Sequence, residues 1–348
     1  MRELTTIQRI KEILPIAESD FIELGRIMGW QCVVKKDEFK AGDFGVYFEI
    51  DSFLPLDERY EFLREKSYKS NPYMGQGFRI KTMRFRGELS QGLFLPLSNF
   101  PECEGKQESD DVTALLSIRK WEVPEVVGTG NDKRRGSKPH GIPTTDETRI
   151  QSKERYLEQL NGHGYYITTK MDGTSCTMYH KDGNFWVCGR TYEYVDNTAD
   201  DEAKENKASP MWVYAHKMGL PEKMKAFGRN LALQGEFCGE GIQKNRLRLW
   251  EPELFIFDAV DLDTLQYLSL DEMTDITDRL GLKRVPLEEE GGHFNYTLEE
   301  MLVKAQGNYP SGTRKEGIVV RSKQNIGRFN SRISFKVINN EFLLKEED

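Results

Sequence analysis

Short segments of alternating apolar and polar residues dominate the first hundred positions and predict β-strands. The turn signal Ala41-Gly42-Asp43 precedes the most apolar of these segments, which its composition marks as a buried strand. A short helix is expected at residues 60–66. Strands are expected at residues 6–10, 21–24, 31–34, 44–50 and 78–85. About five strands with one short helix favour a small barrel of the OB type, a fold often used to bind oligonucleotides.

Two polar stretches separate this region from a different pattern farther along the chain. Residues 102–111 are polar and acidic, and residues 127–145 are rich in Gly, Pro, Lys and Arg, so both predict a linker or a long loop. Beyond them, strands alternate with helices, which indicates an α+β domain. The helices are expected at residues 147–160, 211–227 and 270–280, the first with Thr144, Thr145 and Asp146 as N-cap candidates.

These patterns divide the chain into three parts. We expect an OB-like module at residues 1–105, a linker at residues 106–140, and an α+β domain at residues 141–348. The last part should contain antiparallel sheets with flanking helices.

Composition excludes several classes of protein. The five cysteines show no CxxC spacing and the five histidines form no HExxH, so a disulfide framework and a zinc site are not expected. No apolar run is long enough to span a bilayer, and the first residues show no signal-peptide pattern. We therefore expect an intracellular, cytoplasmic protein without a membrane partner, acting as a monomer.

The net charge of −8 argues against a protein that coats nucleic acid through bulk positive charge. Local basic clusters are nevertheless present, and each one by itself is more readily explained as a solvated face. Three such clusters in an acidic chain indicate a partitioned surface. Their members are Arg79, Lys81, Arg84 and Arg86; Lys133, Arg134, Arg135 and Lys138; and Lys244, Arg246 and Arg248.

The strongest chemical signal is the segment Lys170-Met171-Asp172-Gly173, which follows the apolar run 165–169. A strand that ends in Lys before a tight Asp-Gly turn presents an amine at the mouth of a sheet. Taken alone, this segment is more readily explained as a surface lysine before a turn. Further segments follow in order: Gly189–Thr191, Gly235–Gly239, Leu254–Val260, Glu316–Arg321 and Ser334–Ile338.

This ordered set resembles the motifs of the covalent nucleotidyltransferase superfamily, which contains polynucleotide ligases and mRNA-capping enzymes. The resemblance implies that Lys170 is the nucleophile that forms a lysyl–AMP bond with ATP. A free lysine has a pKa of about 10.4, so burial, nearby cations or a bound metal must lower the pKa before the amine attacks.

The resemblance also implies roles for other residues. Catalytic roles fall to Lys170, Lys336, Glu236 and Glu316. Nucleotide contacts are expected from Lys170, Asp172, Arg190, Glu236, Phe257, Glu316, Lys336 and Arg149, with Phe257 stacking on adenine and Phe255 as the second candidate. Mg²⁺ or Mn²⁺ is expected at Glu316, Glu236 and Asp172. RNA contacts in the OB module are expected from Lys35, Lys36, Arg79, Lys81, Arg84 and Arg86.

Three features favour RNA ligases within this superfamily. Ser175 stands where DNA ligases and capping enzymes usually have Arg, and the OB-like module precedes the lysine instead of following it. The segment Ile142–Gln151, with Arg149 and Gln151, resembles the segment before motif I in the T4 RNA ligase 2-like branch. Two departures stand out: Ser334 replaces the first of two motif V lysines, for which Lys336 alone or Arg332 would compensate, and Thr169 stands where relatives often have Glu.

We therefore expect an ATP-dependent RNA ligase that seals a 3′-OH end to a 5′-phosphate, at nicks in a duplex, in RNA repair. The alternatives are a DNA ligase or a capping guanylyltransferase of the same superfamily, or a non-catalytic nucleic-acid-binding protein built on an OB fold.

Overall fold

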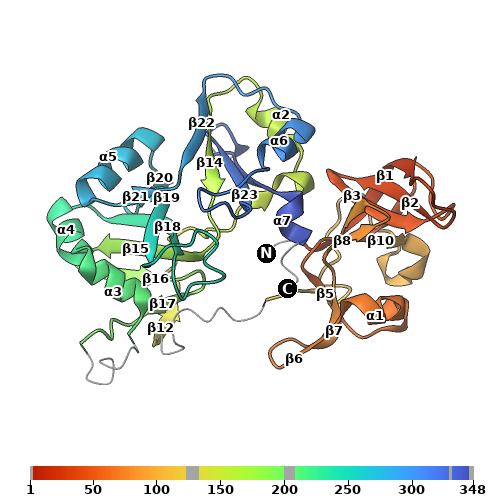
Figure 1. Cartoon of the computed structure of the whole chain (residues 1–348), viewed down its shortest axis with the longest axis horizontal. Helices are drawn as coiled ribbons and strands as arrows, with labels where there is room; N and C mark the ends of the chain where they lie inside the picture. The colour runs from red at the N-terminus through yellow and green to blue at the C-terminus, as the bar shows by residue number, and fades with distance from the viewer. Residues whose placement is uncertain (1–2, 123–132, 200–207, 329–330, 345–348) are drawn as a thin grey trace. The chain divides into compact units, whose positions relative to one another are not determined.

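The computed structural model describes residues 3–122, 133–199, 208–328 and 331–344, drawn in colour in Figure 1. The chain divides into two units. One contains Met1–Pro124, Ile150–Glu154 and Leu343–Asp348, and the other contains Glu125–Arg149 and Arg155–Phe342.

The first unit is an OB-type barrel made from two main sheets and a hairpin. The larger sheet has the order β10-β4-β1-β2-β3 and the smaller the order β11-β5-β7-β6. The larger sheet contains β1 (Thr5–Pro15), β2 (Ile22–Ile27), β3 (Trp30–Lys35), β4 (Phe44–Phe48) and β10 (Leu93–Pro96). The smaller contains β5 (Ser52–Leu54), β6 (Tyr68–Asn71), β7 (Gly75–Arg79) and β11 (Arg119–Lys120), while β8 (Thr82–Phe85) and β9 (Glu88–Gln91) form the hairpin.

Strand β4 confirms the buried strand expected from the apolar segment. Val46 and Phe48 lie in one hydrophobic cluster and Tyr47 lies in another, because successive side chains of a strand point to opposite faces. The short helix expected at residues 60–66 is present as η1 (Glu58–Leu63) followed by α1 (Arg64–Ser67). The strand expected at residues 78–85 is instead divided between β7 and β8.

The acidic stretch 102–111 is packed into the first unit instead of serving as a linker. It follows η2 (Leu97–Asn99) and includes the end of η3 (Pro101–Cys103). Cys103 is fully buried, and the backbones of Ser109 and Asp110 bond to Ile7 of β1. The first unit therefore extends well beyond residue 105. Of the expected linker, residues 123–132 lie outside the described residues, and β12 (Arg134–Ser137) is a strand of the second unit.

The second unit is an α+β domain built on two sheets. One has eight strands and contains β12 together with β15 (Thr174–Lys181), β16 (Asn184–Cys188), β17 (Tyr192–Tyr194), β18 (Leu231–Cys238), β19 (Glu253–Asp261), β20 (Gln266–Tyr267) and β21 (Lys283–Arg284). The other has the order β13-β24-β23-β14-β22, comprising β13 (Thr148–Arg149), β14 (Tyr165–Lys170), β22 (Leu287–Gly291), β23 (Gly317–Ser322) and β24 (Ser334–Ile338). All strand pairs of this unit are antiparallel except β13 with β24 and β19 with β21.

Helices α3 (Pro210–Lys217), α4 (Leu220–Phe227) and α5 (Leu270–Leu280) cover one face of the eight-stranded sheet (Figure 1). Helix α5 has the expected bounds, since Ser269 and Glu272 form a capping box at its start and Gly281 ends it in a left-handed conformation. The helix expected at residues 211–227 is two helices, because Gly219 adopts a φ of 62° and Pro221 lies in the first turn of α4. The remaining helices are α2 (Arg155–Leu160), α6 (Leu298–Lys304) and α7 (Asn340–Leu344).

The prediction of a single helix at residues 147–160 is wrong for the first half of that segment. Thr144, Thr145 and Asp146 do not cap an α-helix, because a strand follows them. Thr148 and Arg149 form β13, which pairs with β24, and residues 150–152 form the short helix η4 (Ile150–Ser152). Residues 150–154 belong to the first unit, where the carbonyl of Gln151 accepts a hydrogen bond from the amide of Gly29. Only α2 remains of the expected helix, because backbone partners distant in the sequence hold the preceding residues.

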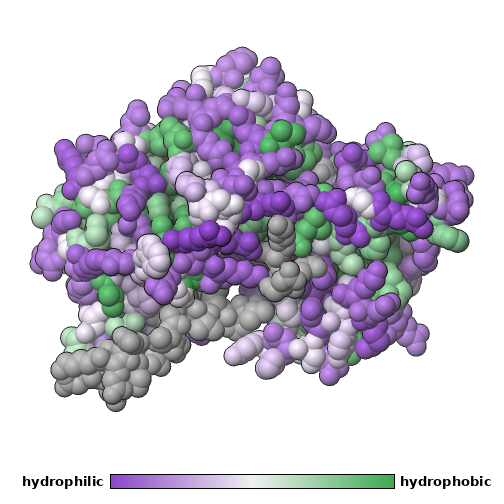
Figure 2. Space-filling view, viewed as in Figure 1, coloured by the Kyte–Doolittle hydropathy of each residue, from purple (hydrophilic) through white to green (hydrophobic). Residues whose placement is uncertain are grey.

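All five cysteines are buried as free thiols, as the absence of paired spacing predicts. On the face shown in Figure 2, hydrophilic residues cover most of the surface and hydrophobic residues form small separate patches. None of the helices in the described parts of the chain combines the length and the apolar character that a membrane-spanning helix requires.

Candidate active site

The predicted nucleophile Lys170 lies at the end of β14, where the strand meets the beginning of β23. Its backbone is paired with Gly317, so the preceding residue, Glu316, lies beside the lysine side chain. The Lys170 Nζ is 2.7 Å from the Glu316 Oε2, and each side chain is about one fifth exposed, 21% and 19%. A side chain at position 317 would collide with the Val337 carbonyl, since a Cβ there would lie 2.1 Å from that oxygen. The Glu-Gly sequence therefore allows β23 to approach β24 closely while Glu316 faces the lysine.

The carboxylates around Lys170 determine its protonation. Burial by itself would lower the pKa of the Lys170 ammonium, but the negative charges of Glu316 and Glu236 raise the pKa, and the net effect is a pKa above the ordinary value. In this arrangement Lys170 is therefore a protonated partner of Glu316. A reaction that uses its amine requires that the carboxylate charge be neutralised first.

Tyr309 links the two members of this pair through their backbones. Its hydroxyl donates a hydrogen bond to the Lys170 carbonyl (2.7 Å) and accepts one from the Glu316 amide (3.1 Å). Tyr309 is 3% exposed. The sequence patterns missed this residue, because it lies in the loop between α6 and β23, and its hydroxyl partners are 139 and 7 positions away.

Asp172 follows the lysine and is held by an arginine from another loop. The Nε of Arg246 lies 2.8 Å from Oδ2 of Asp172, and the guanidinium stacks 4.5 Å from the ring centroid of Phe342. Burial and the negative charge of Glu316 raise the pKa of Asp172, and Arg246 opposes this shift. The sequence marked Arg246 only as a member of a basic cluster, so its pairing with Asp172 is a finding of the structure.

Lys336 and Arg149 add positive charge beside Lys170. Thr148 and Arg149 of β13 pair in parallel with β24, which aligns Arg149 with Lys336. Burial, together with the positive charges of Lys170 and Arg149, lowers the pKa of Lys336 to about 7. No carboxylate forms an ion pair with Lys336 in the parts of the chain that the structure describes. Three cationic side chains crowded together favour binding of an anion such as a phosphate group.

Phe257 lies at an irregularity of β19. Gln234 pairs with Asp258 but the next residue, Gly235, pairs with Ile256, so Phe257 is the extra residue of a β-bulge. The bulge shifts the alternation of the strand: Ile256 and Ala259 share one core cluster, whereas Phe255 and Phe257 pack against another that contains Met171 and Tyr309. Both phenylalanines are therefore half-buried on the side of the predicted nucleophile, as an adenine-stacking role requires.

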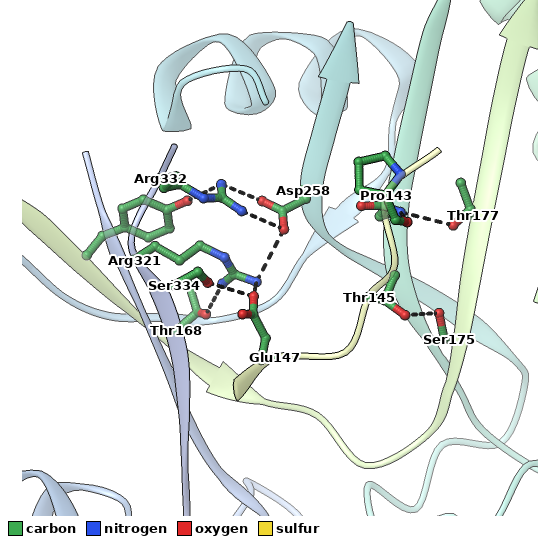
Figure 3. A network of polar contacts seen from close by, with 12 residues as sticks. Pro143, Thr145, Glu147, Thr168, Ser175, Thr177, Asp258, Arg321, Arg332 and Ser334 are labelled. Carbon is green, nitrogen blue, oxygen red and sulfur yellow. Dashed lines mark hydrogen bonds and ion pairs between the residues drawn. The ribbon is translucent and has the colours of Figure 1, made fainter. Parts of the chain in front are cut away.

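A buried network joins the two sheets of this unit beside Phe257 (Figure 3). Arg332 binds Asp258 with two hydrogen bonds of 2.7 and 3.0 Å, and Arg321 contacts Asp258 at 3.4 Å and Glu147 at 3.3 Å. The hydroxyl of Ser334 donates to Glu147 at 2.6 Å. Burial disfavours the charge on Asp258, but both arginines stabilise it and the net pKa is lowered.

This network bears on the two ways in which the missing motif V lysine was expected to be replaced. The Arg332 guanidinium is committed to Asp258, with the arginine side chain only 9% exposed. Ser334 itself is bound to Glu147. The geometry therefore favours Lys336 as the lysine that meets phosphate.

The remaining predicted nucleotide residues lie in the same unit. Glu236 is half-buried on β18, opposite Ser175 of β15, and its charge acts on Lys170. Arg190 follows β16 and its Nη2 lies 3.5 Å from Asp146. Gln151, in contrast, is buried in the first unit.

The six residues predicted to bind RNA all lie in the first unit. Lys35 and Lys36 are exposed at the end of β3, and Arg84 and Arg86 are exposed on the β8–β9 hairpin. The hairpin adjoins β3, since Ser90 Oγ accepts a hydrogen bond from the Val33 amide. Lys81 is half-buried. Arg79 is paired with Asp51 at 3.2 Å, with 22% of its side chain exposed, and is therefore the least available of the six.

Glu316, Glu236 and Asp172 suit the Mg²⁺ or Mn²⁺ expected from the sequence if water and substrate phosphates supply part of its coordination. Carboxylate oxygens suit Mg²⁺ and Mn²⁺. Within the described residues, no three His, Cys, Asp or Glu side chains converge closely enough to enclose a metal. Mg²⁺ commonly keeps several water ligands and uses one or two carboxylates together with substrate phosphates, and this arrangement suits the three residues.

Comparisons with known proteins agree with this geometry. A family model described as an OB-fold domain matches residues 4–97, and one described as RNA ligase matches residues 164–338. The chain is similar to the structure of Naegleria gruberi RNA ligase with pyrophosphate, with 38% identity, coverage of 99% of this chain and 98% of that chain, and a TM-score of 0.88. No match is found among curated proteins.

Two further structures are mutants of the same Naegleria gruberi ligase. One, with AMP and manganese, shares 38% identity over 98% of both chains with a TM-score of 0.88. The other, with ATP and manganese, shares 38% identity over 100% of both chains with a TM-score of 0.89. The chain therefore belongs to the RNA ligase family and is a polynucleotide ligase with an N-terminal OB-fold domain.

Proposed function

We propose that this enzyme uses ATP to seal 3′-OH and 5′-phosphate ends at nicks in duplex RNA or RNA-containing duplexes, as a repair activity. The observation that carries the proposal is the position of Lys170, 2.7 Å from Glu316 and beside the cations Lys336 and Arg149. A lysine next to an anion-binding group of cations is the arrangement that covalent nucleotidyl transfer requires. The similar Naegleria gruberi ligase has been solved with ATP and manganese, which supports the choice of nucleotide.

In the first step, Lys170 Nζ attacks the α-phosphorus of ATP. An N–P bond forms, the P–O bond to the β-phosphate breaks, and pyrophosphate leaves. Glu316 is within hydrogen-bond distance to receive the proton of the lysine ammonium. Lys336 and Arg149 stabilise the charge that develops on the phosphates. A Mg²⁺ or Mn²⁺ ion held by Glu316, Glu236 and Asp172 would neutralise phosphate charge and lower the pKa of Lys170.

Two further transfers complete the proposed reaction. The 5′-phosphate of the RNA attacks the phosphorus of the lysyl–AMP, so that the N–P bond breaks and AMP caps the 5′-phosphate. The 3′-OH then attacks the capped phosphate, and AMP leaves as the new phosphodiester forms. Phe257 and Phe255 supply the apolar wall against which the adenine stacks during these steps. The five buried free thiols suit the reducing interior of a cell.

Incubation with α-labelled ATP and Mg²⁺, followed by denaturing electrophoresis, tests the first step. The unmodified chain should retain label, Lys170→Ala should retain none, and Lys225→Ala, which removes an exposed lysine of α4, should behave like the unmodified chain. Labelling of Lys170→Ala, or no labelling of nucleotide-free protein, would refute the covalent intermediate.

The strand preference needs a second experiment. Sealing of matched nicks that carry RNA or DNA at the 3′-OH side would be compared under single-turnover conditions. Faster sealing of the RNA-ended nick is expected, and equal rates would refute the preference for RNA.

A further inference from the structure

The loop between β18 and β19 exposes an aromatic side chain that the reaction described above does not use. Trp250 is 90% exposed, the most exposed large apolar side chain among the described residues. Tryptophan is usually well buried because of its large apolar area. A single exposed apolar side chain is common on protein surfaces, so the inference depends on the loop that carries Trp250.

The backbone of this loop is firmly held. Three successive turns are closed by hydrogen bonds from the amides of Ile242, Asn245 and Arg248 to carbonyls three residues earlier. The Asn245 side chain bonds both the amide and the carbonyl of Leu249. Gln243, Asn245 and Arg248 adopt positive φ angles of 47°, 39° and 54°. Strained conformations of this kind persist where the surrounding structure enforces them, and they concentrate at functional sites.

The loop has an inner and an outer side. Ile242 is buried in the core beneath α3–α5, and Leu247 and Leu249 pack against the cluster that contains Met171, the neighbour of Lys170. Arg246 pairs with Asp172. Gln243, Lys244, Arg248 and Trp250 are on the exposed side. The loop is therefore attached to the candidate active site through its inner residues while its outer residues face solvent.

The outer side carries positive charge. From Gly241 to Trp250 the chain contains Lys244, Arg246 and Arg248 and no acidic residue. The nearest carboxylates that follow are already paired: Glu251 lies 2.5 Å from the Lys217 Nζ, and Glu253 lies 2.7 Å from the Lys283 Nζ. The exposed Glu240 precedes this stretch. An aromatic face beside the exposed cations Lys244 and Arg248 is complementary to a nucleic-acid strand, in which phosphates alternate with bases.

We propose that residues 243–250, termed the β18–β19 arm, bind the RNA substrate, with Trp250 stacked on an unpaired base at a strand end and Lys244 and Arg248 next to its phosphates. The inference rests on the proposed function, because it takes the partner to be the RNA that this enzyme joins. Stacking is tolerant of sequence, since every base has a π-face, so the arm adds affinity without reading sequence.

The test compares Trp250→Ala with Trp250→Phe and with Val303→Ala, which shortens an apolar side chain of α6 that is 65% exposed. Two quantities would be measured for each variant: adenylylation with labelled ATP, and, in a separate assay without ATP, the Kd of the nucleotide-free enzyme for a nicked RNA duplex with an unpaired base at the break. Trp250→Ala should label normally but bind RNA roughly 5- to 150-fold more weakly. Trp250→Phe should stay within about threefold of the unmodified enzyme, because phenylalanine also stacks.

The outcomes separate this inference from the proposed function. Absence of labelling in the unmodified enzyme would refute the proposed function, whereas RNA binding would still report on the arm. An unchanged Kd for Trp250→Ala, or an equal loss of RNA affinity for Val303→Ala, would refute the proposal that the β18–β19 arm binds RNA. Loss of both labelling and RNA binding in Trp250→Ala would also overturn it, because the tryptophan would then support the nucleotide site. Arg248→Ala should reduce the slope of log Kd against log salt by about one.

Discussion

The hydroxyl of Tyr309 offers a sharp test of how the lysine and its carboxylate are positioned. Tyr309→Phe removes one oxygen atom and keeps the ring, which packs against Met171 and Cys238. That oxygen donates to the Lys170 carbonyl and accepts from the Glu316 amide. The substitution therefore detaches the backbone of the proposed nucleophile from the backbone of its carboxylate partner without touching either side chain.

The size of the effect follows from the burial of these groups. A buried polar group left without its partner costs about 1–3 kcal/mol, so the two backbone groups together should lower the free energy of unfolding by roughly 2–6 kcal/mol. The rate of adenylylation should fall by roughly 10- to 100-fold, because displacing a reacting group by about 1 Å has an effect of this order. The KM for ATP should change little, since Lys336 and Arg149, which are proposed to bind the phosphates, are unaltered.

Single-turnover labelling with α-labelled ATP and thermal unfolding would measure the two effects. Tyr60→Phe is the matched control, because the Tyr60 hydroxyl is buried in the first unit without a hydrogen-bond partner among the described residues. Its removal should leave both the labelling rate and the melting temperature nearly unchanged. If Tyr309→Phe labels within twofold of the unmodified enzyme and melts at the same temperature as Tyr60→Phe, the positioning role is refuted.

Two further predictions concern charges in the same unit. Asp258→Asn should lower the free energy of unfolding, measured by urea denaturation, by about 3–5 kcal/mol, because it leaves the buried Arg332 without its carboxylate and Arg321 with Glu147 as its remaining carboxylate partner. Asp275→Asn, in an exposed pair, should cost less than about 1 kcal/mol, and equal losses would contradict the role of burial. Lys336, with a pKa of about 7, is mostly neutral above pH 7 in the free enzyme, and a bound anion raises that pKa. Pyrophosphate should therefore bind with proton uptake, and its affinity should fall by up to about tenfold per pH unit above pH 7. Calorimetry in buffers of different ionisation enthalpy would detect the proton uptake. If a Lys336→Met variant shows the same pH dependence, Lys336 is not the group that takes up the proton.

Local patterns predicted the elements whose cause is local. Helix α5 was expected within its observed bounds because its capping box and its terminal glycine are adjacent to it in the sequence. Strand β4 was expected because its apolar residues are consecutive. The segment at residues 147–160 resembled a helix by the same criteria, yet β13 forms there because β24, nearly two hundred residues later, supplies its backbone partner.

The sequence by itself determined which chemical groups were candidates for the site. Lys170, Asp172, Glu236, Glu316 and Lys336 were predicted because each stands in a short segment that resembles a motif of the nucleotidyltransferase superfamily. Residues that contact these side chains or their backbones from other segments stand in no such motif. Tyr309 and Arg246 were therefore not predicted to belong to the candidate site.

The tertiary structure alone decided how those groups act on one another. The ion pair of Lys170 with Glu316 joins residues 146 positions apart. Arg332 is bound by Asp258, which lies 74 positions away in the sequence. Protonation was likewise invisible in the sequence: Lys170 and Lys336 are the same residue type, yet carboxylates raise the pKa of one while burial and neighbouring cations lower that of the other. The reason is physical, because burial and electrostatic interaction depend on distance in space, and that distance is set only when the strands pair.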